Sequence, residues 1–157
     1  INVGVTQATI DVCDNPIPEN VYEAKFSVQH CVSVAIKSGK VGFDSFESKA
    51  RQITAPLNRT ITLHCNEKFE KRYPEAWGAD INAEMKDGRI IKVHRDNAKG
   101  DPDDPLSPEE MKEKAMMLFN HAGVEEPLKW IKKTLSIHES NSSFSENDFY
   151  QLLNLKD

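Results

Sequence analysis

The chain has 157 residues, and its 20 Lys and Arg against 25 Asp and Glu give a formal net charge of −5. This length suits one domain, or one domain with a helical tail, and the net negative charge argues against a general nucleic-acid binder, which needs a basic surface. The hydrophobic residues, 38% of the chain, recur in periodic runs that argue against disorder, and no apolar stretch approaches the ~20 residues that cross a bilayer.

The first half of the chain predicts one strand and two helices. Residues 1–13 alternate loosely between apolar and polar, which predicts a strand that ends before Pro16. The first predicted helix covers residues 27–37 and ends at Gly39. It is expected to bury an apolar stripe made of Val28, Cys31, Val32, Ala35 and Ile36. Residues 43–55 predict the second helix, with Pro56 as its stop and Phe46, Ala50 and Ile53 facing inward.

The second half predicts a strand, a hairpin and further helices. Residues 60–65 alternate as a strand does, and residues 79–93 form a β-hairpin around Asp87-Gly88, which we expect to adopt a type I′ turn. Ser107 begins a helix as its N-cap, with Pro108 in the first turn and Glu110 placed to complete a capping box. Residues 127–137 and a short segment from residue 145 predict two more helices.

This order of elements predicts an α+β fold in which an antiparallel sheet carries helices on one face. We expect residues 1–123 to form this two-layer domain. Residues 124–157 are expected to form a C-terminal helical segment, because the last two helices have little left to cover on the sheet.

The cysteines and short motifs show no complete active site. Cys13, Cys31 and Cys65 are widely spaced and lie beside aliphatic residues, so we expect small buried hydrophobic side chains in a reducing cytoplasm. The sequence contains no CxxC, GxSxG, HExxH, P-loop or GxGxxG motif. The chain begins at Ile1 without an initiator Met or a secretory signal, which indicates a fragment or a processed chain.

Polar residues gather where the helix of residues 27–37 begins, namely Lys25, Ser27, Gln29 and His30. Helix N-termini attract anions through their free N–H groups and the helix dipole, so a carboxylate could bind there. Ordinary N-capping by Ser27 with a solvated first turn explains the same residues, and periodicity alone favours that interpretation.

Four segments in register resemble the second domain of the MmgE/PrpD family over about residues 8–122. The resemblance rests on Glu-Ala-Lys-Phe-Ser-Val-Gln-His at 23–30 with the apolar helix to Gly39, Trp-Gly-Ala at 77–79 leading to Asp-Gly-Arg at 87–89, Lys-Gly-Asp-Pro at 99–102 with Pro-Leu-Ser at 105–107, and Glu-Glu-Met-Lys-Glu-Lys at 109–114. The family includes 2-methylcitrate dehydratase, cis-aconitate decarboxylase and an iminodisuccinate epimerase. The resemblance therefore implies a lyase or isomerase.

The resemblance implies that this chain is the lid domain of such an enzyme. Family members have a large all-α domain and a smaller α+β lid, and they remove a proton next to a carboxylate of a small di- or tricarboxylate. The implied partners are that substrate and the missing large α-helical domain, with a homodimer as a possible assembly. Nucleic acid, membrane, metal and cofactor are not implied, and the implied location is cytoplasmic.

The resemblance also implies a site. A tyrosine of the decarboxylase branch matches the position of His30, which implies a catalytic role for His30 and substrate-binding roles for Lys25, Ser27 and Gln29. The change from Tyr to His argues against cis-aconitate decarboxylation, so a 2-methylcitrate dehydratase-like reaction is expected. We expect the His30 side chain to point away from the core. The alternative is a non-catalytic interaction domain that kept the fold.

Overall fold

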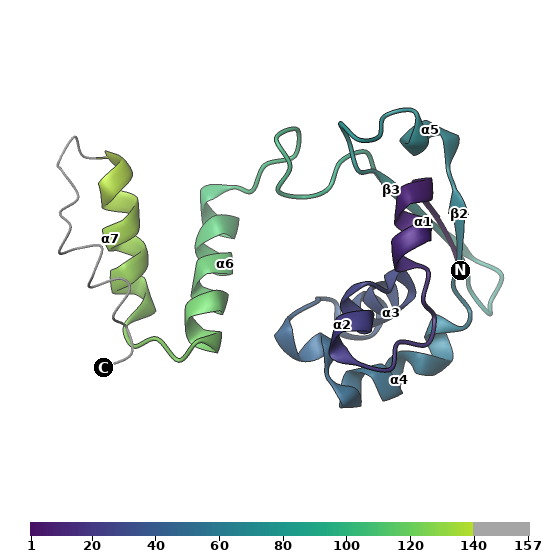
Figure 1. Ribbon diagram of the computed structural model, residues 1–157, viewed down its shortest axis with the longest axis horizontal. Helices are drawn as coiled ribbons and strands as arrows, with labels where there is room; N and C mark the ends of the chain where they lie inside the picture. Colours follow the sequence, from purple (N-terminus) through teal and green to yellow (C-terminus); the bar gives the residue numbers. More distant parts are fainter. Residues whose placement is uncertain (140–157) are drawn as a thin grey trace. The chain divides into compact units, whose positions relative to one another are not determined.

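The computed structural model describes residues 1–139, which fall into two compact units (Figure 1). The first unit is Ile1–Asp104, and the second begins at Pro105. The second unit contains α6 (Pro108–His121) and α7 (Pro127–Glu139), which pack against each other. The two compact units divide before α6, and the expected domain boundary after residue 123 stays a prediction. The helix predicted from residue 145 lies outside the described residues.

The first unit is built on a four-stranded sheet in the order β2-β1-β3-β4. The strands are β1 (Asn2–Val5), β2 (Thr62–Cys65), β3 (Ala79–Glu84) and β4 (Ile90–Arg95). The β1–β3 and β3–β4 pairs are antiparallel, whereas β1 and β2 are parallel. This mostly antiparallel sheet with its helices confirms the α+β class. The parallel pair is possible because the helices between β1 and β2 carry the chain back to the start of the sheet.

The core lies on the face of the sheet that Val3 and Val5 share, and Ile61 completes it. The partly buried residues around it come from the first residue of the chain and from α1, α3, β2 and β3, namely Ile1, Ile10, Val28, Val32, Leu63, Ala79 and Ile81. The prediction of a strand through residue 13 is wrong, because α1 (Gln7–Cys13) begins directly after β1. Thr6 caps this helix by accepting a hydrogen bond from the Thr9 backbone N–H, which ends the strand.

The helix predicted over residues 27–37 is confirmed as α3 (Val28–Ser38), which follows the short α2 (Val21–Lys25). Ser27 is its N-cap and Gly39, with φ of 74°, closes its C-terminus. The expected buried stripe is wrong in part, because Val28 and Val32 are only partly buried and Ile36 is 54% exposed. The fully buried residues of α3 lie on another face, namely Gln29, His30, Ser33 and Val34.

The single helix predicted over residues 43–55 is two elements. A 3₁₀ turn, η1 (Phe43–Phe46), precedes α4 (Ser48–Asn58), and α4 contains Pro56 instead of stopping there. The buried residues of α4 are Thr54 and Asn58, whereas Ile53 is exposed. The hydrophobic pattern of α3 placed Val28 and Val32 against the sheet core, but it gave no sign of the second buried face, where α3 packs on α4 and both helices bury polar side chains.

The hairpin of β3 and β4 is confirmed, but its turn differs from the expected type. Gly88 has φ of 84°, and no residue other than glycine has positive φ in the hairpin, so Asp87 does not adopt the geometry of a type I′ turn. The Gly88 N–H donates to the Met85 carbonyl at 2.9 Å, and the Met85 N–H donates to the Arg89 carbonyl at 2.8 Å. This pattern is that of the longer hairpin loop in which one glycine takes the left-handed conformation.

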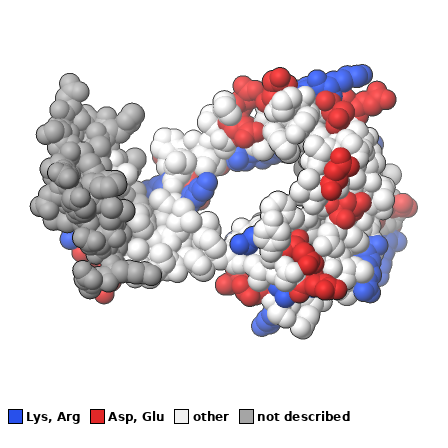
Figure 2. Space-filling model, viewed as in Figure 1, with Lys and Arg blue, Asp and Glu red and all other residues white. Residues whose placement is uncertain are grey.

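Charged side chains of both signs are interspersed over the face of the first unit shown in Figure 2.

Among the described residues, no helix has the length and apolar character needed to cross a membrane.

Candidate functional site

The N-terminus of α3 is the centre of a buried polar network. The Ser27 hydroxyl accepts a hydrogen bond from the His30 backbone N–H at 3.0 Å and donates one to the Asn15 carbonyl at 2.6 Å. The Gln29 side-chain amide donates to the Asp14 carboxylate. Ser27 and Gln29 are both buried, so these bonds fix the segment that follows α1 against the first turn of α3.

The His30 side chain belongs to the same network and is 0% exposed. Its Nε2 is 2.7 Å from the Ser45 carbonyl oxygen, and its Nδ1 is 3.0 Å from the Thr54 hydroxyl. A carbonyl oxygen only accepts, so Nε2 carries a proton and donates to Ser45. The Thr54 hydroxyl lies 3.0 Å from His30 Nδ1 and 3.0 Å from the Ala50 carbonyl oxygen. The Phe46 ring packs beside the imidazole, with 5.9 Å between ring centroids.

The expectation that the His30 side chain points away from the core is therefore wrong. The ring joins α3 to η1 and α4, and both of its nitrogens have partners within the first unit. The catalytic role implied by the family resemblance stays a prediction.

The structure brings three of the four predicted site residues together. Ser27, Gln29 and His30 share the network at the start of α3, whereas Lys25 is exposed at the C-terminal end of α2. Sequence reasoning missed the partners of these residues, which are Asp14, Asn15, Ser45 and Thr54. No motif links them to α3, because they lie 12 to 24 positions away. The segment after α1 brings in Asp14 and Asn15, and the packing of η1 and α4 brings in Ser45 and Thr54.

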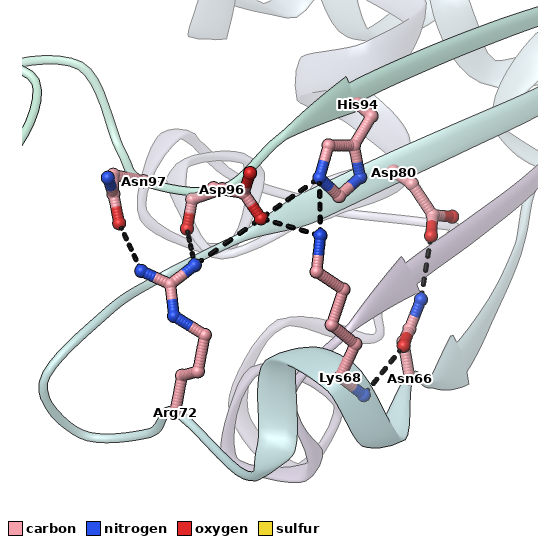
Figure 3. Close-up of polar contacts among 7 residues, drawn as sticks. All are labelled: Asn66, Lys68, Arg72, Asp80, His94, Asp96 and Asn97. Carbon is pink, nitrogen blue, oxygen red and sulfur yellow. Dashed lines mark hydrogen bonds and ion pairs between the residues drawn. The ribbon is translucent and has the colours of Figure 1, made fainter.

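A second polar cluster, which sequence reasoning also missed, joins α5 (Glu67–Glu70) to the end of β4 (Figure 3). Three donors converge on one carboxylate oxygen, Oδ1 of Asp96. Lys68 Nζ is 2.8 Å from it, His94 Nε2 is 3.0 Å from it and Arg72 is 3.4 Å from it. We call these four residues the Asp96 cluster. The register of β4 places His94 opposite Asp80 and against Phe69 of α5.

Hydrogen bonds from Lys68 and then His94 lower the pKa of Asp96 from 3.8 to about 2. Lys68 Nζ also lies 3.1 Å from His94 Nε2. This nitrogen cannot donate to Asp96 and accept from Lys68 at the same time, so the proton on His94 decides which of the two bonds exists. Since the Lys68, Arg72 and His94 side chains all bond to Asp96, the Asp96 cluster joins α5 and the residues after it to the end of β4 by ion pairs.

A third set of contacts lies on the face of the sheet opposite the core. Asn66 donates to the Asp80 carboxylate at 2.7 Å and also caps α5 by accepting from the Lys68 backbone N–H at 2.9 Å. Asp80 lies directly over Gly4, where an added Cβ would come 2.7 Å from its Oδ1 atom. These contacts hold the start of α5 against β3.

The cysteines offer no activated thiol. Cys13 and Cys31 are partly buried, and burial raises the pKa of both, with Cys13 raising that of Cys31 further. The expectation of burial is wrong for Cys65, which is exposed; desolvation and then the Glu70 carboxylate raise its pKa. A raised pKa lowers the thiolate fraction and hence the reactivity. Within residues 1–139, no three His, Cys, Asp or Glu residues are grouped as a metal site requires.

Comparison with known proteins gives one assignment. The model of the MmgE/PrpD C-terminal domain matches residues 1–135, which include both units as far as most of α7. No curated protein matched the sequence. The match covers the elements that carry the α3 network and the Asp96 cluster. The chain therefore belongs to the MmgE/PrpD family, and residues 1–135 correspond to its C-terminal domain.

Proposed function

We propose that this chain is the substrate-closing lid domain of a lyase or isomerase that acts on a small di- or tricarboxylate. In the reaction, a proton is removed from the carbon next to a carboxylate, and a 2-methylcitrate dehydratase-like reaction is the preferred form. The observation that carries the proposal is the family match over residues 1–135. The partner required by the proposal is the large α-helical domain of the same enzyme.

The described residues support a model in which this domain closes over the substrate and the companion domain supplies the groups that transfer protons. Proton removal and delivery need at least one group near neutral pKa in contact with the substrate. In the first unit, the candidate for that role, His30, is buried with both ring nitrogens bonded. The chain alone is therefore expected to be inactive, and the groups that exchange protons with substrate are expected on the companion domain.

The alternative function is a non-catalytic interaction domain, and the same burial of His30 favours it. The two functions differ in what the complete gene product does. As an enzyme, it should turn over 2-methylcitrate, cis-aconitate or iminodisuccinate, and it should exchange the hydrogen next to the carboxylate with deuterium from D₂O. The 157-residue chain assayed alone serves as the control.

Deuterium exchange without turnover would still support the proton-abstraction step. A folded gene product that neither turns over these three acids nor catalyses exchange would overturn the enzymatic proposal. That result would favour the interaction domain.

A further inference from the structure

The short turn η1 has backbone carbonyls at its C-terminal end that no bond within the turn satisfies. Helix ends of every kind leave such acceptors, and a four-residue 3₁₀ turn has few bonds of its own. At its N-terminal end, the Gly42 N–H donates to the Ser45 hydroxyl at 2.9 Å, and the Ser45 N–H donates to the Gly42 carbonyl at 3.2 Å. The backbone groups at the N-terminal end of η1 are thus bonded to residues of the turn itself, whereas the carbonyls at its C-terminal end need partners from other elements.

Two helices each send one side chain to the end of η1. His30 Nε2 of α3 lies 2.7 Å from the Ser45 carbonyl oxygen, and the Arg51 guanidinium of α4 donates to the Phe46 carbonyl at 2.6 Å. These are consecutive carbonyls, and their two partners come from the elements on either side of the turn. The end of η1 is therefore held from both flanks.

The ring that holds Ser45 is itself held in one orientation. Thr54 meets His30 Nδ1 at 3.0 Å, and its hydroxyl lies 3.0 Å from the Ala50 carbonyl oxygen. Because His30 is fully buried, water does not compete for these bonds. The imidazole is consequently held with its Nε2–H aimed at the Ser45 carbonyl oxygen, which only accepts.

We propose that His30 is a positioning residue, which with Arg51 clamps the end of η1 and so fixes the segment 42–47 against α2 and α3. This proposal replaces direct proton transfer by His30 with an effect that passes through the Ser45 carbonyl. The link to catalysis rests on the proposed function, in which this domain closes over the substrate. The clamp itself is a property of the chain described here.

Two variants separate the clamp from simple packing. In His30→Gln, the amide nitrogen takes the place of Nε2 and keeps the bond to Ser45, whereas in His30→Asn the shorter amide reaches only the place of Nδ1. Amide hydrogen exchange at Ser45 and Glu47 should rise about three- to tenfold in His30→Asn, the loss of one buried hydrogen bond, and less in His30→Gln. The amides of α6 serve as the internal control.

A spectroscopic measurement does not depend on whether a variant folds. The ¹⁵N shifts of the His30 ring in the unmodified chain should show that Nε2 carries a proton. A ring with a proton on Nδ1 and none on Nε2, or equal exchange rates for the two variants at Ser45 and Glu47, would overturn the clamp.

The complete gene product then tests the positioning role. His30→Gln should retain more kcat/KM than His30→Asn, because the conservative variant keeps the bond to Ser45. Equal losses of about 10² or more in both variants, with exchange at Ser45 unchanged, would identify His30 as a direct proton-transfer group and overturn the proposal. If the unmodified gene product is inactive, the proposed function fails, and the NMR and exchange results still decide the clamp.

Discussion

Single atoms decide how α5 sits on the sheet. Gly78, just before β3, lies against the ring of Phe69, which is almost fully buried and stacks on His94 with 5.4 Å between centroids. An added Cβ at Gly78 would come 2.3 Å from the Phe69 ring and 3.0 Å from the Asp96 carbonyl oxygen. The glycine is thus required by close packing, because one of the two neighbours is backbone and cannot move aside.

Gly78→Ala should therefore destabilise the first unit by about 1–3 kcal/mol, the usual cost of an extra carbon in a well-packed site. Urea unfolding followed by circular dichroism measures this change. Gly42→Ala is the matched control, because a Cβ at Gly42 meets nothing within 4 Å and its φ of −137° suits alanine. Equal stability of the two variants would contradict the packing argument.

The Asp96 cluster makes a prediction about pH. The pKa of Asp96 is lowered to about 2 from its ordinary 3.8, so its ion pairs stabilise the folded state above pH 3.8. That contribution is lost as pH falls from about 4 towards 2, where Asp96 becomes protonated in the folded state as well. The difference in unfolding free energy between the wild type and Asp96→Asn should shrink over this interval.

Urea titrations of both proteins at pH 6, 4 and 2.5 measure the difference. Asp103→Asn, which removes an exposed carboxylate from the turn that ends at Asp104, is the control for the loss of one negative charge. If the difference in unfolding free energy is constant with pH, the ion pairs of the Asp96 cluster do not stabilise the fold.

At the scale of elements, the sequence predicted best where local chemistry decides the structure. The capping box of Ser107 and Glu110 is present as expected, with bonds of 2.7 and 3.2 Å. Gly39 and Gly123 end their helices with positive φ, as glycines at these positions predict. Each of these features depends on residues within four positions of one another, so the sequence alone determines them.

The elements that the sequence predicted poorly depend on distant contacts. The alternation of residues 1–13 gave no sign that Thr6 would stop the strand, and the stripe of α3 indicated an apolar buried face. Burial of His30 requires Thr54 and Ser45, which lie 24 and 15 positions away. The family resemblance indicated the segment that holds the buried network of α3, but only the packing of η1 and α4 shows what the His30 side chain contacts.

The cap of α6 provides a test at this scale. Ser107→Ala removes the hydroxyl that accepts from the Glu110 N–H, and it should destabilise the helix by about 1 kcal/mol. Faster amide exchange in the first turn of α6 measures the effect. Ser107→Asp should restore most of the protection, because a carboxylate caps a helix as well as a hydroxyl does. Equal exchange in Ser107→Ala and the wild type would contradict the role of the cap.

At the scale of the molecule, the last residue of the first unit is held by contacts within that unit. Asp104, its last residue, pairs with Arg95 and with Lys99, each at 3.2 Å, and its carbonyl accepts from the Gly100 N–H at 2.8 Å. The sheet, its core and the α3 network all lie within Ile1–Asp104. The family match nevertheless continues through α6 to residue 135, so the family domain is larger than this self-contained unit.

A chain of residues 1–104 should therefore fold without the second unit. Val3, Val5 and Ile61 keep all the packing partners that surround them, since those partners are Ile1 and residues of α1, α3, β2 and β3. Amide exchange in β1 and β3 should match that of a chain of residues 1–135, which keeps the whole family match. If protection in these strands falls in the shorter chain but not in the longer one, α6 and α7 contribute to the stability of the sheet, and the first unit is not an independent folding unit.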